Sequence, residues 1–125
     1  MIQKVNKTRQ ILVAFILVAA ITGLSSCEKY SFLPPTIDQT VTLHFQTDIQ
    51  PIFDANCTRC HGGLTSPNLT AAKSYQSLTT GGYVNLPAES SRLYTQIISS
   101  GHTARSTDTG KLKILSWIKQ GALNN

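Results

Sequence analysis

The chain has 125 residues, of which 41% are hydrophobic and 14% are charged. This length and composition predict one small globular domain and exclude an intrinsically disordered chain. The formal net charge is +5, but Lys4, Lys7 and Arg9 lie among the first ten residues, which contain no acidic residue. The rest of the chain holds eight Lys or Arg and six Asp or Glu, a balance of about +2. Because no basic stripe remains to follow a phosphate backbone, we expect no nucleic-acid partner.

An apolar run follows the basic residues and extends from Ile11 to Leu24. It is shorter than the roughly 20 residues that a transmembrane helix needs, but it fits the core of a signal peptide. The run ends at Leu24-Ser25-Ser26-Cys27, which resembles the bacterial lipobox. The resemblance implies a lipoprotein signal peptide over residues 1–26 and lipidation of Cys27, which becomes the mature N-terminus. We therefore expect a membrane anchor at Cys27. The expected location is the cell envelope of a Gram-negative bacterium, in the periplasm or at the outer membrane and cell surface.

Residues 27–42 have no clear hydrophobic period and contain Pro34-Pro35. We interpret them as a partly extended tether and residues 43–125 as the folded domain. The first predicted helix starts at Thr47 or Asp48, which are good N-cap residues, and has Pro51 in its first turn. Its apolar residues recur at i, i+3 and i+4, as on one face of a helix.

Three further helices are predicted. The second covers Thr70–Leu78 and is stopped by Gly81-Gly82, and the third is capped by Ser90 or Ser91. The last covers about Lys111–Gln120 and ends at Gly121, because glycine is favoured just after a helix. Only Thr40–Gln46 has the alternation of a strand, so the predicted fold class is all-α.

Residues 57–61 read Cys57-Thr58-Arg59-Cys60-His61, a C-x-x-C-H motif. This motif is the attachment signature of c-type haem. Cysteines three residues apart on a helical turn lie on one face, about 4.5 Å apart along the axis. Both thiols can therefore reach one edge of a porphyrin, and His61 follows as the proximal iron ligand. We predict one covalently bound haem c, held by Cys57 and Cys60.

A C-x-x-C pair also occurs in redox disulfides and in zinc sites. A thioredoxin-like site requires a βαβ context, and no strand pattern precedes Cys57. A structural zinc site requires two further ligands, and only His44 and His102 remain, far apart in the sequence. A plain Cys57–Cys60 disulfide leaves His61 without a role.

Residues 48–53 (Asp-Ile-Gln-Pro-Ile-Phe), the motif and Gly62-Gly63 together resemble the opening of cytochrome c-like domains. Such domains are found in lipoproteins and multidomain proteins of Bacteroidetes and Planctomycetes. Residues 75–78, 91–94 and 117–122 are also similar, so the resemblance covers about residue 43 to the C-terminus. It implies the cytochrome c fold, in which short helices pack around one covalent haem and the first and last helices cross beside it. The implied core or haem contacts are Ile49, Ile52, Phe53, Leu115, Trp117 and Ile118, with a propionate hydrogen bond as the alternative role of Trp117.

Many members of this group have a Met-Pro before the last helix, and that Met is the sixth iron ligand. Here the only methionine is Met1, which is lost with a signal peptide. The corresponding loop contains His102, 41 residues after His61, and we predict it as the distal iron ligand. An exposed His102 beside an open sixth site remains an alternative. His44, between Leu43 and Phe45, is a third option, although a buried and hydrogen-bonded role suits its apolar flanks better.

The function predicted from these features is one-electron transfer by a lipid-anchored, single-haem cytochrome. This is an electron carrier rather than an enzyme, and its partners would be redox proteins. Histidine ligation predicts a lower reduction potential than methionine ligation. The main alternative is a haem-based gas-binding or peroxidase-like module with an open sixth iron site. A third possibility is an interaction domain without haem, in which Cys57 and Cys60 form a disulfide.

Overall fold

The computed structural model describes residues 6–7, 9–13 and 35–125. The chain divides into two units, Met1–Leu33 and Pro34–Asn125. In the first unit, residues 6–7 and 9–13 are helical. Cys27 and most of the predicted signal peptide lie outside the described residues. No helix within the described ranges is both long enough and apolar enough to cross a membrane.

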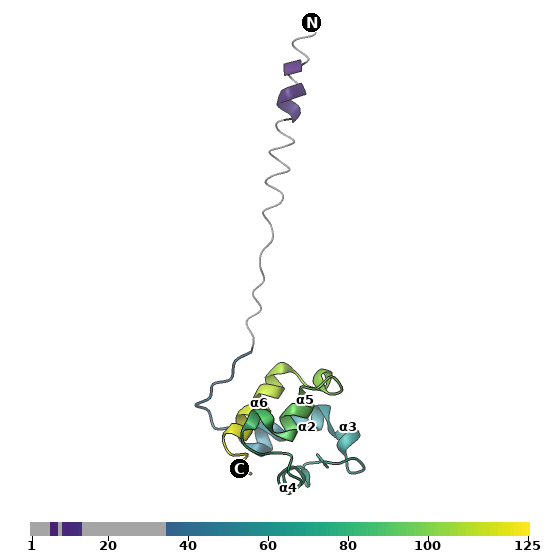
Figure 1. The fold of residues 1–125 in the computed structure, drawn as a ribbon, viewed down its shortest axis with the longest axis vertical. Coiled ribbons are helices and arrows are strands. Elements are labelled where there is room, and N and C mark those ends of the chain that lie inside the picture. The colour runs from purple at the N-terminus through teal and green to yellow at the C-terminus, as the bar shows by residue number, and fades with distance from the viewer. Residues whose placement is uncertain (1–5, 8, 14–34) are drawn as a thin grey trace. The chain divides into compact units, whose positions relative to one another are not determined.

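Residues 35–125 fold into short helices and contain no strand, which confirms the all-α class (Figure 1). The predicted strand at Thr40–Gln46 is wrong, because this segment consists of a turn, extended backbone and the start of a helix. In chain order the elements are η2 (Phe45–Ile49), α2 (Gln50–Asn56), α3 (Thr58–His61), α4 (Ser74–Thr80), η3 (Ala88–Ser90), α5 (Arg92–Ile97), η4 (Thr103–Arg105) and α6 (Asp108–Lys119).

The first helical segment starts two residues before the predicted cap at Thr47. It opens with the π-helical turn η2, in which the Gln50 N–H donates to the Phe45 carbonyl, and it continues directly into α2. Asp48 is not the N-cap. Its carboxylate lies inside the first turn and accepts the His44 N–H at 3.0 Å. Pro51 has no N–H to donate, so its place just after the wider π-turn costs no hydrogen bond.

Of the two middle helices, α5 begins where the sequence predicted and α4 begins later. Ser91 caps α5, and its hydroxyl accepts the Tyr94 N–H. The second predicted helix is shorter than expected, because residues 71–73 form a turn before α4 begins at Ser74. The C-cap of α4 is Gly81, as the paired glycines predicted.

The last helix, α6, begins at Asp108, three residues before its predicted start. Thr107 caps it, and the Thr107 hydroxyl accepts the Gly110 N–H at 3.1 Å. Gly110 lies within the first turn of the helix. A Cβ at this position would lie 2.6 Å from Ser106 Oγ and 3.4 Å from Ile52 Cγ2. The end at Gly121 is as predicted: Gly121 has a φ of 97°, and the N–H groups of Gly121 and Ala122 donate to Ile118 and Trp117. This pair of hydrogen bonds is a Schellman motif.

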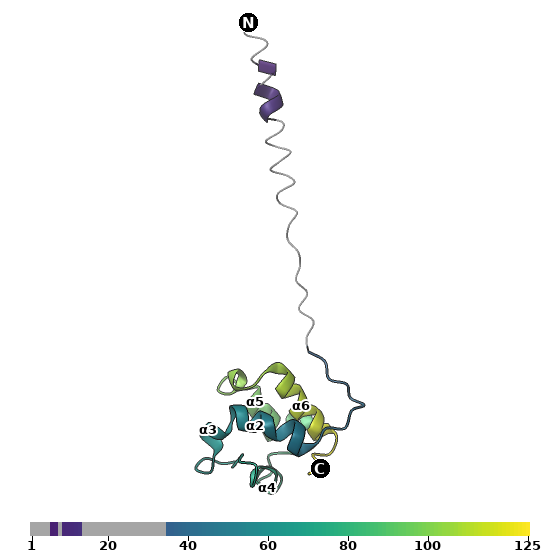
Figure 2. The same cartoon turned by 180° about the vertical axis from the view of Figure 1, so that it is seen from behind.

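The core lies where α6 packs against η2, η3 and α5. Both ribbon views place α6 beside the η2–α2 segment (Figure 2). Trp117 is fully buried, and its ring centre lies 5.2 Å from that of Phe45. Its indole N–H donates to the Leu123 carbonyl at 2.9 Å, so the packing role expected for Trp117 is the one observed.

The segment before residue 43 is also attached to α6. Gln39 Nε2 donates to Ser116 Oγ at 3.0 Å, and Gln120 Nε2 donates to the Val41 carbonyl at 2.9 Å. Gln120 Oε1 accepts the Leu43 N–H at 2.9 Å. The folded unit therefore includes the last residues of the segment that the sequence assigned to a tether.

Candidate functional site

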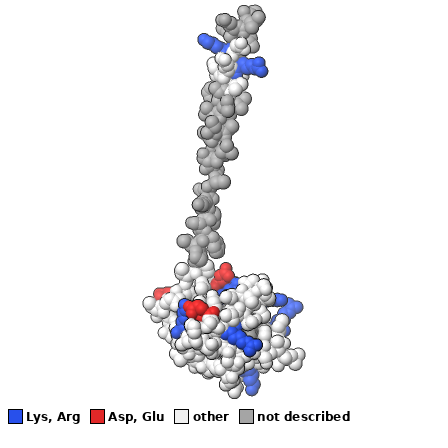
Figure 3. Space-filling model, viewed as in Figure 1, with Lys and Arg blue, Asp and Glu red and all other residues white. Residues whose placement is uncertain are grey.

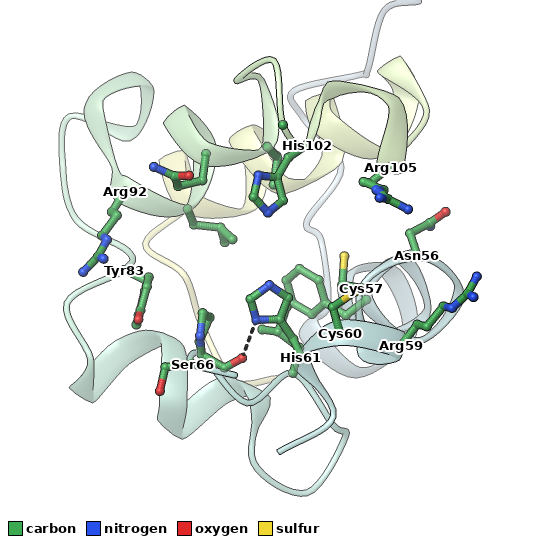
Figure 4. Close-up of a pocket in the computed structure, with 17 residues that line it drawn as sticks. Asn56, Cys57, Arg59, Cys60, His61, Ser66, Tyr83, Arg92, His102 and Arg105 are labelled. Carbon is green, nitrogen blue, oxygen red and sulfur yellow. Dashed lines mark hydrogen bonds between the residues drawn. The ribbon is translucent and has the colours of Figure 1, made fainter. Parts of the chain in front are cut away.

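A cavity of about 340 Å³ opens between the C-x-x-C-H motif and the segment that follows α5 (Figure 4). Its volume falls at the lower end of the roughly 300–1,000 Å³ that small-molecule and cofactor pockets occupy. The buried walls are apolar, and they comprise Phe53, Leu69, Leu93 and Ile97. The motif residues Cys57, Cys60 and His61 line one side, and His102 lines the other. The fold thus brings together all four residues that the sequence assigned to haem binding.

The two motif cysteines lie on one helical turn. Cys57 precedes α3, and its carbonyl accepts the N–H groups of Cys60 and His61 at 3.1 and 2.9 Å. Cys57 is half-buried, Cys60 is exposed, and both thiols are free. Burial raises the pKa of the Cys57 thiol above its usual value, and the neighbouring Cys60 raises it further. The Cys57 thiol is therefore protonated at neutral pH.

His61 is held by a hydrogen bond on the side of the ring that faces away from the cavity. Its Nδ1 lies 3.0 Å from the carbonyl oxygen of Pro67. Because a carbonyl only accepts, the bond requires a proton on Nδ1 and leaves Nε2 as the ring nitrogen without a hydrogen-bond partner. Metal-binding histidines commonly have this arrangement, in which a backbone carbonyl fixes the ring and its tautomer.

The loop that carries the Pro67 carbonyl is itself fixed at both ends. The Leu69 N–H donates back to the His61 carbonyl at 2.8 Å, which closes the loop. The Asn68 N–H donates to Ser77 Oγ on α4 at 2.9 Å. The Asn68 side chain accepts from the N–H and the hydroxyl of Thr70. The orientation of His61 therefore depends on α4 as well as on its own helix.

His102 approaches from the opposite wall. It lies in a tight turn in which the Ser99 carbonyl accepts the N–H groups of both His102 and Thr103. The ring centres of His61 and His102 are 6.4 Å apart, and the ring planes are inclined by 39°. Figure 4 shows the two rings facing each other across the cavity, each with a nitrogen directed toward the other.

This separation is short enough for His61 and His102 to be the residues that would hold one metal ion between them, since metal–imidazole bonds are about 2.0–2.1 Å long at zinc. Within the described residues, no group of three or more His, Cys, Asp or Glu is placed to hold a metal ion.

The charged side chains of the cavity all carry the same sign. Arg59, Arg92 and Arg105 line it, and no Asp or Glu does. Elsewhere on the domain, the face in Figure 3 has separate basic and acidic groups rather than a continuous basic patch. The positive charge that lines the cavity suits a ligand that carries carboxylates.

His44, the third option for the distal ligand, does not line the cavity. Its side chain is exposed, so the expectation that it is buried was wrong. The residue is instead the N-cap of η2, where its backbone N–H binds Asp48. Apolar neighbours in the sequence misled the prediction, because Leu43 and Phe45 face the core while His44 faces away from it.

Among the residues of the site that the sequence did not assign to it are Pro67, Tyr83 and Arg92. Pro67 acts through its carbonyl, which any residue has. Tyr83 and Arg92 come together because the Leu93 N–H donates to the Tyr83 carbonyl at 2.8 Å. No local motif indicates this contact between segments ten residues apart.

Comparison of the chain with protein-family models, with curated proteins and with solved structures finds no match. The function must therefore be argued from the geometry of the site.

Proposed function

We propose that residues 43–125 form a cytochrome c-like domain with one haem c, and that the protein is a lipid-anchored carrier of single electrons. The observation that carries the proposal is the C-x-x-C-H motif at the wall of a cavity in which a second histidine faces the first at 6.4 Å. The apolar walls and the three arginines without an acidic neighbour also fit a haem, which has an apolar ring and two carboxylates.

Cys57 and Cys60 are the residues that would hold the haem covalently. Each thiol adds across a vinyl C=C bond: a S–C bond forms, and the thiol hydrogen goes to the neighbouring carbon. This addition consumes no oxidant or reductant, but it requires free thiols, and both are free. Burial raises the pKa of the Cys57 thiol, whereas redox-active C-x-x-C sites depend on a thiol of lowered pKa.

His61 and His102 are the residues that would bind the iron. The Nδ1–Pro67 hydrogen bond orients His61 so that Nε2 would be its ligand nitrogen. Haem bound in this way supplies a one-electron ferric/ferrous couple, and two histidine ligands favour a lower potential than a histidine and a methionine. The exposed position of Cys60 leaves the thioether edge at the surface, where a redox partner can approach.

The lipid anchor at Cys27 belongs to the same proposal. Residues 28–38 separate Cys27 from the first segment attached to α6. Fully extended, they span at most about 40 Å. An anchored domain with this reach stays close to the membrane and to redox partners embedded in it.

A second candidate function is the binding of a diatomic gas, and one observation favours it. His61 is fixed through Pro67, whereas no group of the described residues is hydrogen-bonded to the His102 ring. A ligand without such a support is the easier one to displace. Carbon monoxide titration of the reduced protein separates the two functions: an electron carrier binds it weakly, and a gas-binding module binds it at micromolar concentration.

The pyridine haemochrome spectrum of protein expressed with haem-maturation machinery tests the proposal. We expect the spectrum of haem with two thioether bonds, a shifted spectrum for Cys57→Ala or Cys60→Ala, and no covalent haem in the double variant. His44→Ala is the matched control and should load haem like the wild type. Failure of the wild type to bind haem covalently, under conditions that load another c-type cytochrome, would overturn the proposal.

A further inference from the structure

The three arginines of the cavity are not equivalent. In Figure 4, Arg92 and Tyr83 lie on one side of the two histidines, whereas Cys57, Arg59 and Arg105 lie on the other. With the cysteines and histidines assigned to the haem, the three arginines and Tyr83 are the remaining titratable groups among the lining residues. Arg92 is therefore the only one of the three arginines on the side away from the attachment cysteines.

Arg92 is held in place but has no acidic partner. Its guanidinium carbon lies 4.8 Å from the centre of the Tyr83 ring, within the range of a cation–π interaction. The Leu93 N–H, bonded to the Tyr83 carbonyl, keeps the two residues side by side. None of the ion pairs within the described residues involves Arg92. Stacking on Tyr83 uses a face of the guanidinium and leaves its N–H groups, which lie in the plane, free to bind an anion.

A haem carries its two vinyl groups and its two propionates on opposite edges of the ring. Attachment of the vinyl edge to Cys57 and Cys60 therefore directs the propionates to the far side of the cavity. We infer that Arg92, supported by Tyr83, is the carboxylate-binding subsite of this cavity and binds a haem propionate. This inference rests on the proposed function. Arg59 and Arg105, on the cysteine side, do not take part in it.

The inference predicts a specific pH dependence of the reduction potential. In the wild type, Arg92 balances the charge of the propionate that it binds, so the titration of that propionate does not affect the potential. In Arg92→Gln, the unbalanced carboxylate becomes charged as the pH rises from about 4.3, the ordinary value for a carboxyl group. A negative charge stabilises the ferric state, so the potential falls. We expect the ferric/ferrous ratio at a fixed potential to change on the order of tenfold, or about 59 mV for one electron.

Arg59→Gln and Arg105→Gln are the matched controls. Each removes one positive charge beside the same cavity, so each lowers the potential by a constant amount, with no new titration. Arg92→Lys keeps the positive charge, so the dependence of its reduction potential on pH should match that of the wild type. A pH-independent shift in Arg92→Gln, or a new titration in either control, would contradict the assignment of Arg92. Loss of covalent haem from the wild type would instead contradict the proposed function, so the two failures are distinguishable.

Two further measurements complete the test. Acetate or phosphate at about 100 mM should leave the wild-type potential unchanged, because the propionate already occupies the subsite. A potential that depends on the added anion would show that Arg92 binds a free anion instead. Infrared difference spectra of the wild type cover the case in which Arg92→Gln does not mature. The carboxylate bands of the propionate at Arg92 should show no protonation above about pH 4.3, and protonation above that pH would overturn the inference.

Discussion

Replacement of Trp117 by Phe separates the packing role of this residue from a role in cofactor binding. Trp117 is fully buried against Phe45, and its indole N–H donates to the Leu123 carbonyl at 2.9 Å. Loss of one hydrogen bond costs about 1 kcal/mol, and the smaller ring forfeits two buried carbon groups, or about 1.6 kcal/mol. We therefore expect the free energy of unfolding to fall by about 2–3 kcal/mol, and Tm to fall on the order of 15 °C.

The assay is urea denaturation of the haem-loaded protein, followed by far-ultraviolet circular dichroism, together with potentiometry. Tyr75→Phe is the matched control, because its hydroxyl donates to the Ala122 carbonyl of the same C-terminal segment at 3.1 Å. It should cost only about 1 kcal/mol. Neither variant should change the reduction potential. A potential that shifts in Trp117→Phe with a new pH dependence would refute the reasoning, because it would place the indole on the cofactor.

Two further variants test how the elements around the site are held. The pKa of Asp48 is lowered, first by the hydrogen bond from the His44 N–H and then by Lys113, so its carboxylate stabilises the fold above its unfolded pKa of about 3.9. Asp48→Ala should lower the free energy of unfolding by about 1 kcal/mol at pH 7. Urea titrations should show that this difference from the wild type disappears as the pH falls through the lowered pKa. A difference that stays constant down to pH 2 would contradict this. Gly62→Ala places a Cβ 2.7 Å from the Thr58 carbonyl oxygen. Thermal melts should therefore show a loss of folding stability of about 1–3 kcal/mol. The control Thr65→Ala, at an exposed position, should leave stability unchanged. Equal stability of these two loop variants would show that the backbone approach at Gly62 is not tight.

The helix ends that the sequence predicted well are those set by a single residue. Ser91 caps α5 because its hydroxyl replaces a missing backbone acceptor, and Gly121 ends α6 because it adopts a positive φ. The missed start of α6 is also set by a single residue, since the Thr107 hydroxyl accepts the Gly110 N–H. Gly110 was left outside the predicted helix, but it lies in the first turn of α6, where a Cβ would be 2.6 Å from Ser106 Oγ. The wide turn before Pro51 has no local signature that we recognised.

The residues of the candidate site also differ in how well the sequence predicted them. Cys57, Cys60 and His61 are neighbours on one turn, so their spacing alone brought them together. His102 reaches the cavity through a turn 41 residues later, and the sequence indicated it by its place in the loop that corresponds to the Met-Pro loop of similar domains. The contacts that orient the site join residues that are nearer in the sequence but share no motif, as with Pro67 on His61 and Tyr83 beside Arg92. Such contacts follow from packing and leave no periodic pattern in the sequence.

The ferric absorption and electron paramagnetic resonance spectra of the haem-loaded protein, compared with those of His102→Ala, test the central claim most directly. If His61 and His102 bind the iron from opposite sides, the wild type is low-spin and His102→Ala becomes high-spin, while His44→Ala remains like the wild type. A low-spin spectrum that His102→Ala leaves unchanged would contradict the account, because it would show that the imidazole 6.4 Å from His61 is not the sixth ligand.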